Sequence, residues 1–333
     1  MILEILIPQY KEDESVLKNL LDSIEVQQSV DLKNDVGVVI VNDGSDIILS
    51  ESFLDKYTFP IKYIKREHGG VSRARNACLD EATADYVMFC DADDMFLNAC
   101  GLYIIMREIK NGGFDSMFSV FVEETKHPKT GEVLYINREM DSTFVHGKVH
   151  RRRYLIDKGI RWNDSLTIHE DSYFNCLCQN LSKDVKYCNT PFYLWKWRNE
   201  SVCRHDPKYI LKTYNNMLES STALVNEFLK RNRKDKAEFY ATGMIMDSYY
   251  TMNKEEWLNQ DNIEYRNSTE KRFAKYYVKF RSLFENIDET IKNQIIVGIR
   301  NRMFQEGMMM EAITFNMWIE HILDLYQQEV NGK

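Results

Sequence analysis

The chain has little of what marks several specialised protein classes. Its 333 residues include only five prolines and 14 glycines, which excludes collagen-like and low-complexity disordered proteins. No apolar run approaches the roughly 18 residues that cross a bilayer, so we expect no transmembrane segment. The opening residues turn acidic without a basic stretch, so we expect no signal peptide. With 44% hydrophobic residues, the chain can still bury a substantial core.

The chain also has fewer basic than acidic residues. Lys and Arg number 43 against 51 Asp and Glu, which gives a net charge of −8. Residues 1–204 hold 25 basic and 32 acidic residues, so most of the negative charge lies there. General binding to nucleic acid requires clustered Lys and Arg and is therefore not expected. We interpret the basic run at 150–153 as a solvated face.

The cysteines follow no metal-binding or disulfide pattern. None of the seven forms a C-x-x-C pair, and no His follows at zinc-ligand spacing. We therefore expect reduced cysteines that serve as small core residues. This predicts a cytoplasmic protein, either free or peripheral to the membrane.

The first hundred residues alternate between strand-like and helix-like segments. Strands are expected at 2–7, 36–41, 61–64 and 86–90, and helices at 14–26 and 71–81. This order is typical of a mostly parallel α/β sheet, in which ligands bind beyond the carboxyl ends of the strands. Segments 8–10, 42–44 and 91–93 are therefore expected to meet at one edge. After Pro207, the last proline, helical spacing of apolar residues predicts an all-helical region.

A short acidic sequence follows the strand expected at 86–90. Asp91 and Asp93 stand two residues apart, so both carboxylates can reach one hard divalent cation. Magnesium bound in this way often also contacts the phosphates of a nucleotide. An ordinary acidic loop is the alternative, and the buried strand in front of the motif favours the metal site.

Three further segments carry chemical signals. Gly69 and Gly70 lead into a helix whose first turns hold Arg73 and Arg75, which suits phosphate or carboxylate binding. Glu170 and Asp171 open another helix, as in a catalytic pair or in ordinary capping. The last segment, interpreted either as a lid over a ligand or as a packed surface segment, contains Trp197, Arg198, Ser201, Arg204 and His205.

Taken in order, these motifs resemble glycosyltransferase family 2, whose members have the GT-A fold. The matching segments are 7–12 for P-x-Y-x-E, 41–46 for V-D-D-G-S-x-D, 69–76 for G-x-x-x-A-R-N, 91–93 for D-x-D, and 147–171 for G-K-x-x-R…E-D. The resemblance covers about residues 1–204. It implies a Rossmann-like mixed sheet in domain 1–204. The helical domain expected at 205–333 lies outside the resemblance, and we expect it to serve in acceptor binding, packing or homo-oligomer formation.

The resemblance also implies a function, which is inverting transfer of a sugar from a nucleoside-diphosphate sugar to an acceptor hydroxyl. A UDP-sugar is the expected donor, and a glycan, polymer, lipid-linked sugar or protein is the expected acceptor. The donor would be contacted by Pro8, Tyr10, Glu12, Asp43, Gly70, Arg73 or Arg75, Asp91 and Ala92. Asp93, with Asp91 directly or through water, would hold Mn²⁺ or Mg²⁺. Asp171, beside Glu170, would be the general base.

Two departures from the family pattern and two alternative functions remain. Asn42 replaces the first Asp of the V-D-D-G-S-x-D segment, and Asp46 follows Ser45 directly. A nucleotidyltransferase on a related α/β fold is one alternative, although the first strand lacks the Gly- and Arg-rich signature of such enzymes. The other is a non-catalytic protein that binds sugar nucleotides or a partner.

Overall fold

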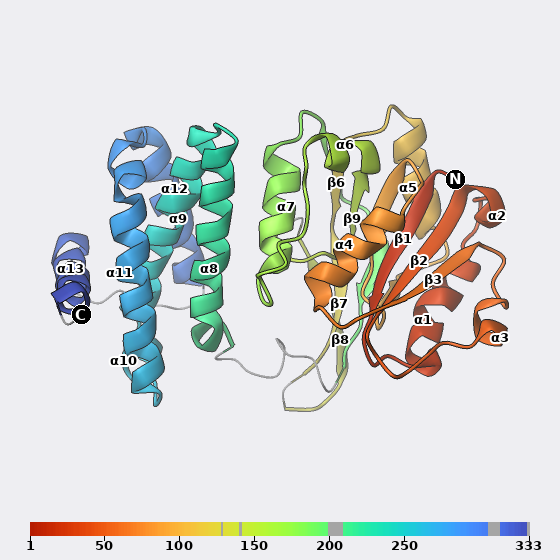
Figure 1. Ribbon diagram of the computed structural model, residues 1–333, viewed down its shortest axis with the longest axis horizontal. Coiled ribbons are helices and arrows are strands. Elements are labelled where there is room, and N and C mark those ends of the chain that lie inside the picture. Colours follow the sequence, from red (N-terminus) through yellow and green to blue (C-terminus); the bar gives the residue numbers. More distant parts are fainter. Residues whose placement is uncertain (128, 140–141, 199–208, 306–313, 332–333) are drawn as a thin grey trace. The chain divides into compact units, whose positions relative to one another are not determined.

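The computed structural model describes residues 1–127, 129–139, 142–198, 209–305 and 314–331 (Figure 1). The chain divides into two compact units, Met1–Val202 and Cys203–Lys333. Within the described residues, no helix is long and apolar enough to span a membrane. The six cysteines described are free thiols, and five of them are buried.

The first unit is built on a seven-stranded mixed sheet in the order β10-β6-β9-β4-β1-β2-β3. Its strands are β1 (Leu3–Gln9), β2 (Val36–Asp43), β3 (Ile61–Arg66), β4 (Tyr86–Phe89), β6 (Ser116–Ser119), β9 (Lys148–Arg151) and β10 (Val185–Cys188). Only β9 runs antiparallel to its neighbours β4 and β6. The predicted mostly parallel α/β sheet is confirmed.

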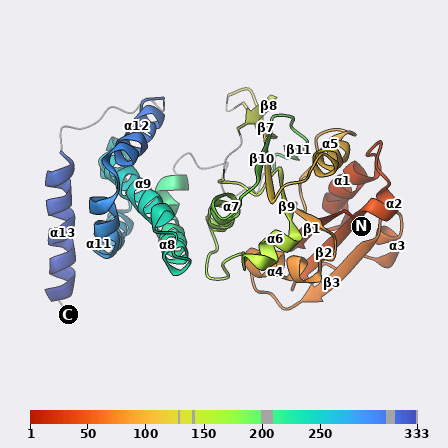
Figure 2. The same cartoon turned by 90° about the horizontal axis from the view of Figure 1, so that it is seen from above.

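Helices cover both faces of this sheet (Figures 1 and 2). They are α1 (Glu14–Glu25), α2 (Leu32–Asp35), α3 (Glu51–Leu54), α4 (Val71–Glu81), α5 (Gly101–Lys110), α6 (Arg152–Asp157) and α7 (Glu170–Asn180). Alternate residues of β1, such as Ile5 and Ile7, share one core cluster with Leu17 and Leu21 of α1. On the other face, Phe89 of β4 contacts aromatic rings of α7 and the loop before it. Period-two strands thus present apolar side chains to both layers.

The first strand extends further than the sequence predicts. Pro8 was expected to end it, yet β1 continues to Gln9 and pairs with β2 through that residue. Pairing with β4 stops at Leu6, so by Pro8 the strand has a partner on one side only. A proline is tolerated where its missing N–H would face no neighbouring strand.

A second sheet lies beside the carboxyl end of the first. It has four strands in the order β5-β11-β7-β8, namely β5 (Met95–Phe96), β7 (Phe121–Lys126), β8 (Val133–Arg138) and β11 (Tyr193–Trp195). The sequence pattern at 114–145 predicts strands joined by a turn at 129–131, and this turn does join β7 to β8 in an antiparallel hairpin. We call residues 91–94, between β4 and β5, the Asp-rich loop. Strand β11, near the end of this unit, pairs with β5 and so lies next to this loop.

In its described residues, the second unit is entirely helical. It contains α8 (Tyr209–Lys230), α9 (Lys234–Met252), α10 (Glu255–Leu258), α11 (Ile263–Asn286), α12 (Glu289–Gln305) and α13 (Phe315–Asn331). Helix α9 packs against α8, α11 and α12, and its residues 244–252 are all buried. Phe273 of α11 stacks on Trp318 of α13 with ring centroids 5.0 Å apart. The predicted helical carboxy-terminal region is confirmed.

Candidate active site

The carboxyl ends of β1, β2 and β4 lie side by side, as predicted. The registers pair Gln9 with Asn42 and Leu6 with Phe89. The segments that follow these strands therefore share one edge of the sheet, although they are more than 30 residues apart in sequence. This edge holds the residues that the sequence motifs single out.

Asp43, at the end of β2, organises the glycine loop before α4. Its two carboxylate oxygens accept hydrogen bonds from the backbone N–H groups of Gly69 and Gly70, at 2.9 and 2.8 Å. Gly70 has a φ of 88°, a conformation that a residue with a Cβ rarely adopts. Tyr10 stacks on His68 of the same loop, with ring centroids 4.5 Å apart. The loop and the end of β1 thus form a preorganised aromatic and acidic wall.

The departure at Asn42 has a structural explanation. Its side chain is fully buried, and its amide donates to the carbonyl of Ile47 at 3.0 Å and to the hydroxyl of Tyr63 at 3.0 Å. Its side-chain oxygen accepts from the backbone N–H of Ser45 at 2.7 Å. A carboxylate could not make the donor half of this network. Asn42 therefore shapes the turn after β2.

The Asp-rich loop after β4 gives each carboxylate a different environment. Burial raises the pKa of Asp91, but Arg75 and His146 outweigh it and hold that pKa below its usual range. Burial and repulsion from Asp91 raise the pKa of Asp93, against the pull of Arg198. The side chains of Asp91 and Asp93 remain 32% and 25% exposed. Both therefore line the open side of the loop.

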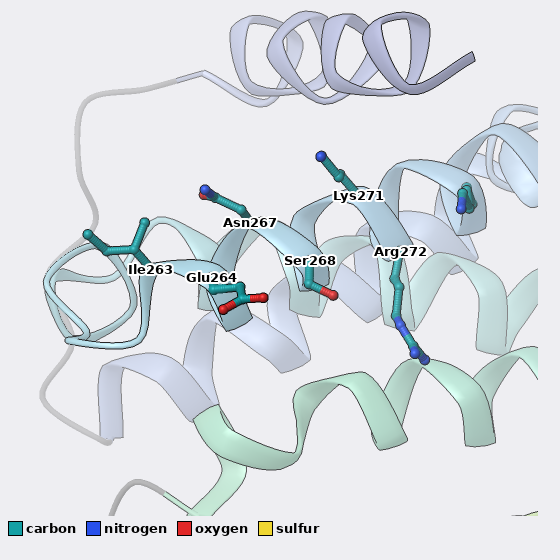
Figure 3. A pocket seen from close by; sticks show the side chains of 7 residues that line it. Ile263, Glu264, Asn267, Ser268, Lys271 and Arg272 are labelled. Carbon is teal, nitrogen blue, oxygen red and sulfur yellow. The ribbon is translucent and has the colours of Figure 1, made fainter. Parts of the chain in front are cut away.

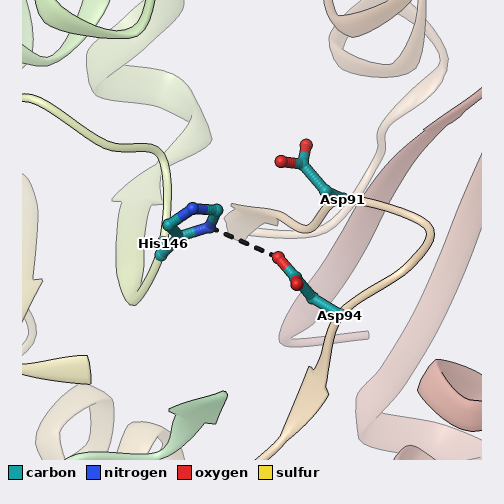
Figure 4. A group of neighbouring side chains, drawn as sticks. All are labelled: Asp91, Asp94 and His146. Atoms are coloured by element: carbon teal, nitrogen blue, oxygen red, sulfur yellow. Dashed lines mark ion pairs between the residues drawn. The ribbon is translucent and has the colours of Figure 1, made fainter. Parts of the chain in front are cut away.

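Asp94 is the buried anchor of this loop. It accepts from the hydroxyl of Tyr193 at 2.6 Å and from the backbone N–H of Lys196 at 2.9 Å. Its carboxylate lies 3.4 Å from Nδ1 of His146 (Figure 4). Burial and repulsion from Asp93 and Asp91 raise its pKa well above the usual range. The sequence pattern did not point to His146 or Tyr193, because only tertiary folding brings them to Asp94.

Arg75 joins three carboxylates from two distant segments. Its guanidinium lies 2.9 Å from Asp91, 3.0 Å from Glu170 and 2.8 Å from Asp171, and its side chain is only 4% exposed. The cation also lies over the ring of Trp162, 4.4 Å from the centroid. One buried cation thus holds the start of α7 against the Asp-rich loop. Its neighbour Arg73 is 64% exposed and lies 3.5 Å from Asp164.

Asp171 has the titration behaviour of a base that works near neutral pH. Its pKa is raised to about 7: burial raises the pKa most, Arg75 lowers it, and repulsion from Glu170 and Asp91 raises it. Its second oxygen accepts from the backbone N–H of Val145 at 3.1 Å. Asp171 lies at the start of α7, in the first turn that the sequence predicted. A carboxylate with a pKa near the working pH is a stronger base than an ordinary one and is still ionised often enough to accept a proton.

Only part of the expected lid can be placed. Ser201, Arg204 and His205 lie outside the described residues. Trp197 follows β11, and its backbone N–H donates to Glu124 at 3.3 Å. Arg198 lies 2.9 Å from Asp93 and 3.6 Å from Glu12. The start of the segment therefore lies against the Asp-rich loop.

The remaining residues expected at the site also lie around this edge. Pro8 is half-buried in β1, and Ala92 is buried between the half-buried Asp91 and Asp93. Glu12 accepts from the backbone N–H of Tyr10 at 2.7 Å. Burial raises the pKa of Glu12, backbone hydrogen bonds lower it, and Asp93 raises it further. These contacts place Glu12 beside the acidic loop.

Comparison with known proteins agrees with this geometry. Residues 4–160 match the model of glycosyl transferase family 2. This part of the chain belongs to glycosyltransferase family 2. The family predicted from the motifs is therefore confirmed for this part of the chain.

Two curated relatives match this chain over less than half of their own length. Glycosyltransferase GlyA of Streptococcus pneumoniae serotype 4 is 28% identical over 247 residues, which cover 67% of this chain and 34% of that protein. Minor teichoic acid biosynthesis protein GgaA of Bacillus subtilis is 32% identical over 209 residues, covering 55% and 44%. The chain thus matches about a third of the first protein's length and less than half of the second's.

A solved structure shows the same fold. Residues 1–349 of Staphylococcus aureus TarS, in complex with UDP-GlcNAc, align with a TM-score of 0.67. The alignment covers 100% of this chain and 93% of that one, at 15% identity. The likeness supports the GT-A fold followed by a helical region.

The second unit has a groove of a different character. It runs along one side of α11 (Figure 3) and is lined by Ile263, Glu264, Asn267, Ser268, Lys271, Arg272 and Lys275. These residues recur at helical spacing and are mostly polar, and Arg272 also pairs with Glu219. The face of α11 that lines the groove is exposed and mainly basic, whereas the candidate active site of the first unit is lined by carboxylates that are mostly buried.

Proposed function

We propose that the chain transfers a sugar from a UDP-sugar to an acceptor hydroxyl with inversion, using Asp171 as the general base. The observation that carries this proposal is the bridge through Arg75. A single buried guanidinium binds Asp171 and Asp91, so the base candidate is held next to the D-x-D loop. Family 2 membership and the UDP-GlcNAc complex of the TarS structure support a nucleotide-sugar donor.

We assign the nucleotide to the wall formed by the end of β1 and the glycine loop. The ring of Tyr10, which is 40% exposed, offers a face for the base, while Pro8 and Asp43 border it. Exposed Arg73 is better placed than buried Arg75 to approach the donor. Arg75 is instead a positioning residue, because its donors are directed at three carboxylates. A bidentate Arg fixes carboxylate geometry more strictly than a lysine can.

The residues of the Asp-rich loop fit a divalent cation. Asp91 and Asp93 offer oxygen ligands from the exposed side of the loop, and Asp93 carries a raised pKa that a nearby cation would relieve. Asp91, Asp94 and His146 also place one ligand atom each within 4.8 Å of the others. Asp94 is fully buried and hydrogen-bonded at both oxygens, so we assign the ion to Asp91 and Asp93. When bound, Mg²⁺ or Mn²⁺ would neutralise charge on the leaving diphosphate.

The remaining steps follow from the chain's own groups. Asp171 accepts the proton of the acceptor hydroxyl while that oxygen attacks the anomeric carbon. The N–H of Val145 and the guanidinium of Arg75 hold the Asp171 carboxylate in one orientation. Glu170 and Asp91 share the same guanidinium, which keeps Asp171 from being fully stabilised as an anion. The relative GgaA, named for minor teichoic acid biosynthesis, favours a polymer of that kind as the acceptor.

A ligand screen with one variant tests the donor and metal assignments. We expect UDP-sugars with Mn²⁺ to raise the melting temperature, since ligands that bind the native state stabilise it. Asp93→Asn should abolish the Mn²⁺-dependent part of the shift, while Asp164→Asn, outside the D-x-D loop, should retain it. Differential scanning fluorimetry with a panel of nucleotide sugars measures both. If no nucleotide sugar binds with Mn²⁺, or if Asp93→Asn behaves like the wild type, the proposal fails.

The pH profile tests the base independently. Because the pKa of Asp171 is raised to about 7, we expect kcat to rise about tenfold per pH unit below that value and to level off above it. Assays from pH 5 to 9 at saturating donor and metal measure the profile. A flat profile between pH 5 and 7 would contradict the assignment.

The same raised pKa predicts how stability depends on pH. Folded Asp171 binds its proton more tightly than the unfolded chain does, whose pKa is about 3.9. The contribution of Asp171 to stability is therefore lost as pH rises from about 4 to about 7. The melting temperature of the wild type relative to Asp171→Asn should fall across this window.

A further inference from the structure

The segment after β11 is attached to the Asp-rich loop at its backbone. The N–H of Lys196 donates to Asp94 at 2.9 Å, and the hydroxyl of Tyr193 donates to the same carboxylate at 2.6 Å. One residue further, the N–H of Trp197 donates to Glu124 at 3.3 Å. These contacts fix the backbone before Arg198 next to the Asp-rich loop. The guanidinium of Arg198 can therefore change partners by a rotation of its own side chain.

The guanidinium of Arg198 lies between two acidic side chains. Its Nη1 is 2.9 Å from Oδ2 of Asp93 and 3.6 Å from Oε1 of Glu12. The side chains of Arg198, Asp93 and Glu12 are 33%, 25% and 18% exposed. Burial raises the pKa of both acids, and Arg198 opposes this. Arg198 thus neutralises the carboxylate to which the metal is assigned.

We propose that Arg198 is an exchangeable counter-ion, which a divalent cation displaces from Asp93 and which then binds the diphosphate of the donor. The proposal rests on the metal site of the proposed function. A divalent ion on Asp93 removes the charge that holds the guanidinium and repels it at short range. The diphosphate that accompanies the metal offers oxygens whose geometry suits a planar guanidinium.

An Arg198 that exchanges partners would affect the affinities for metal and for nucleotide in opposite ways, which a purely structural ion pair would not do. While Arg198 holds Asp93, it competes with the metal, so metal binding alone is weakened. Once nucleotide is present, Arg198 gains a new anionic partner, so nucleotide binding is strengthened. Arg198 therefore couples the two ligands, and coupling of binding free energies is reciprocal. Removing the guanidinium should change the two affinities in opposite directions.

Two binding measurements on the same proteins test this. Mn²⁺ affinity without nucleotide is measured by electron paramagnetic resonance of the free ion, and UDP affinity at saturating Mn²⁺ by calorimetry. We expect Arg198→Gln to bind Mn²⁺ about fivefold more tightly and UDP about fivefold more weakly, the size of a partly exposed ion pair. Lys126→Gln is the matched control, because Lys126 lies near Trp197 but has no contact with Asp93 among those described. It should change neither affinity by more than about twofold.

The other outcomes separate the exchange from the metal site itself. If Asp93→Asn loses Mn²⁺ but Arg198→Gln binds it as the wild type does, the exchange is wrong and the metal site stands. If Arg198→Gln weakens both ligands, Arg198 is a scaffold residue and the proposal is overturned. If the wild type binds no Mn²⁺, the metal site and the exchange both fall, while UDP binding still tests the donor assignment.

Discussion

Asp171→Asn should lower kcat by about 10²–10⁴-fold, the usual contribution of a positioned general base. The amide has nearly the same shape but cannot take the proton from the acceptor hydroxyl. Asp171 is bound through Arg75 and the N–H of Val145, and neither contact belongs to the nucleotide wall. UDP binding should therefore stay within about twofold of the wild type. Initial rates at saturating donor, together with UDP calorimetry, measure the two effects.

Glu170→Gln is the matched control for this variant. It removes a neighbouring carboxylate that binds the same guanidinium at 3.0 Å, but leaves Asp171 in place. We expect a loss of about tenfold or less, and a lower apparent pKa in the rate profile, because a negative charge beside Asp171 has gone. Should the two variants lose activity equally, or should Asp171→Asn remain active, Asp171 would not be the base.

Arg75→Met should destabilise the first unit by about 3–5 kcal/mol, the usual cost of breaking a buried charged cluster by removing one partner. The methionine fills much of the space over Trp162 but leaves Asp91, Glu170 and Asp171 without their shared cation. Three carboxylates that close together cannot all stay ionised. Urea unfolding followed by tryptophan fluorescence measures the change, and activity should be lost with it.

Three companion variants make this result specific. Arg73→Met, two residues away and 64% exposed, should change stability by no more than about 0.5 kcal/mol. Arg75→Lys keeps the charge but cannot span carboxylates on both sides, so an intermediate loss is expected. The double variant Arg75→Met/Asp171→Asn should recover part of the lost stability, because one uncompensated charge is removed. A wild-type-like Arg75→Met protein would refute the bridging role.

In the site that these expectations describe, the guanidinium of Arg75 affects the pKa values of two carboxylates. Arg75 lowers the pKa of Asp91, which suits a metal ligand, and limits the rise of the pKa of Asp171, which suits a base. Both carboxylates then have charge states matched to their proposed roles near neutral pH. Arg198 completes the charge balance on the open side of the same loop.

Much of the fold could be predicted from the sequence because its signals are local. The apolar runs at β1, β2 and β4 and the helical spacing of α1 and α4 identify the elements within a few residues. A parallel sheet brings the carboxyl ends of its strands to one edge, so the convergence of Tyr10, Asp43 and Asp91 follows from element order. The pairing of β5 with β11 in the second sheet was not foreseen, because these short strands contain too few residues to show a pattern.

The charge pattern of the site could not be predicted in the same way. The sequence shows two arginines in α4, and either could have faced a nucleotide. Helix α4 packs on β1 and β2, and this buries Arg75 at 3% exposure while Arg73 stays at the surface. The partners of Arg75 at Glu170 and Asp171 are some 95 residues away in sequence.

The sequence by itself determined the family, the α/β order, the helical carboxy-terminal region and the carboxylates available for chemistry. Those properties depend on residue type and on spacing within one element or motif. Tertiary structure alone decided which carboxylate is buried, which is bridged by Arg75, and which is neutralised by Arg198. Burial and charge pairing depend on neighbours brought together from distant segments, and they set the pKa values that separate a metal ligand from a base.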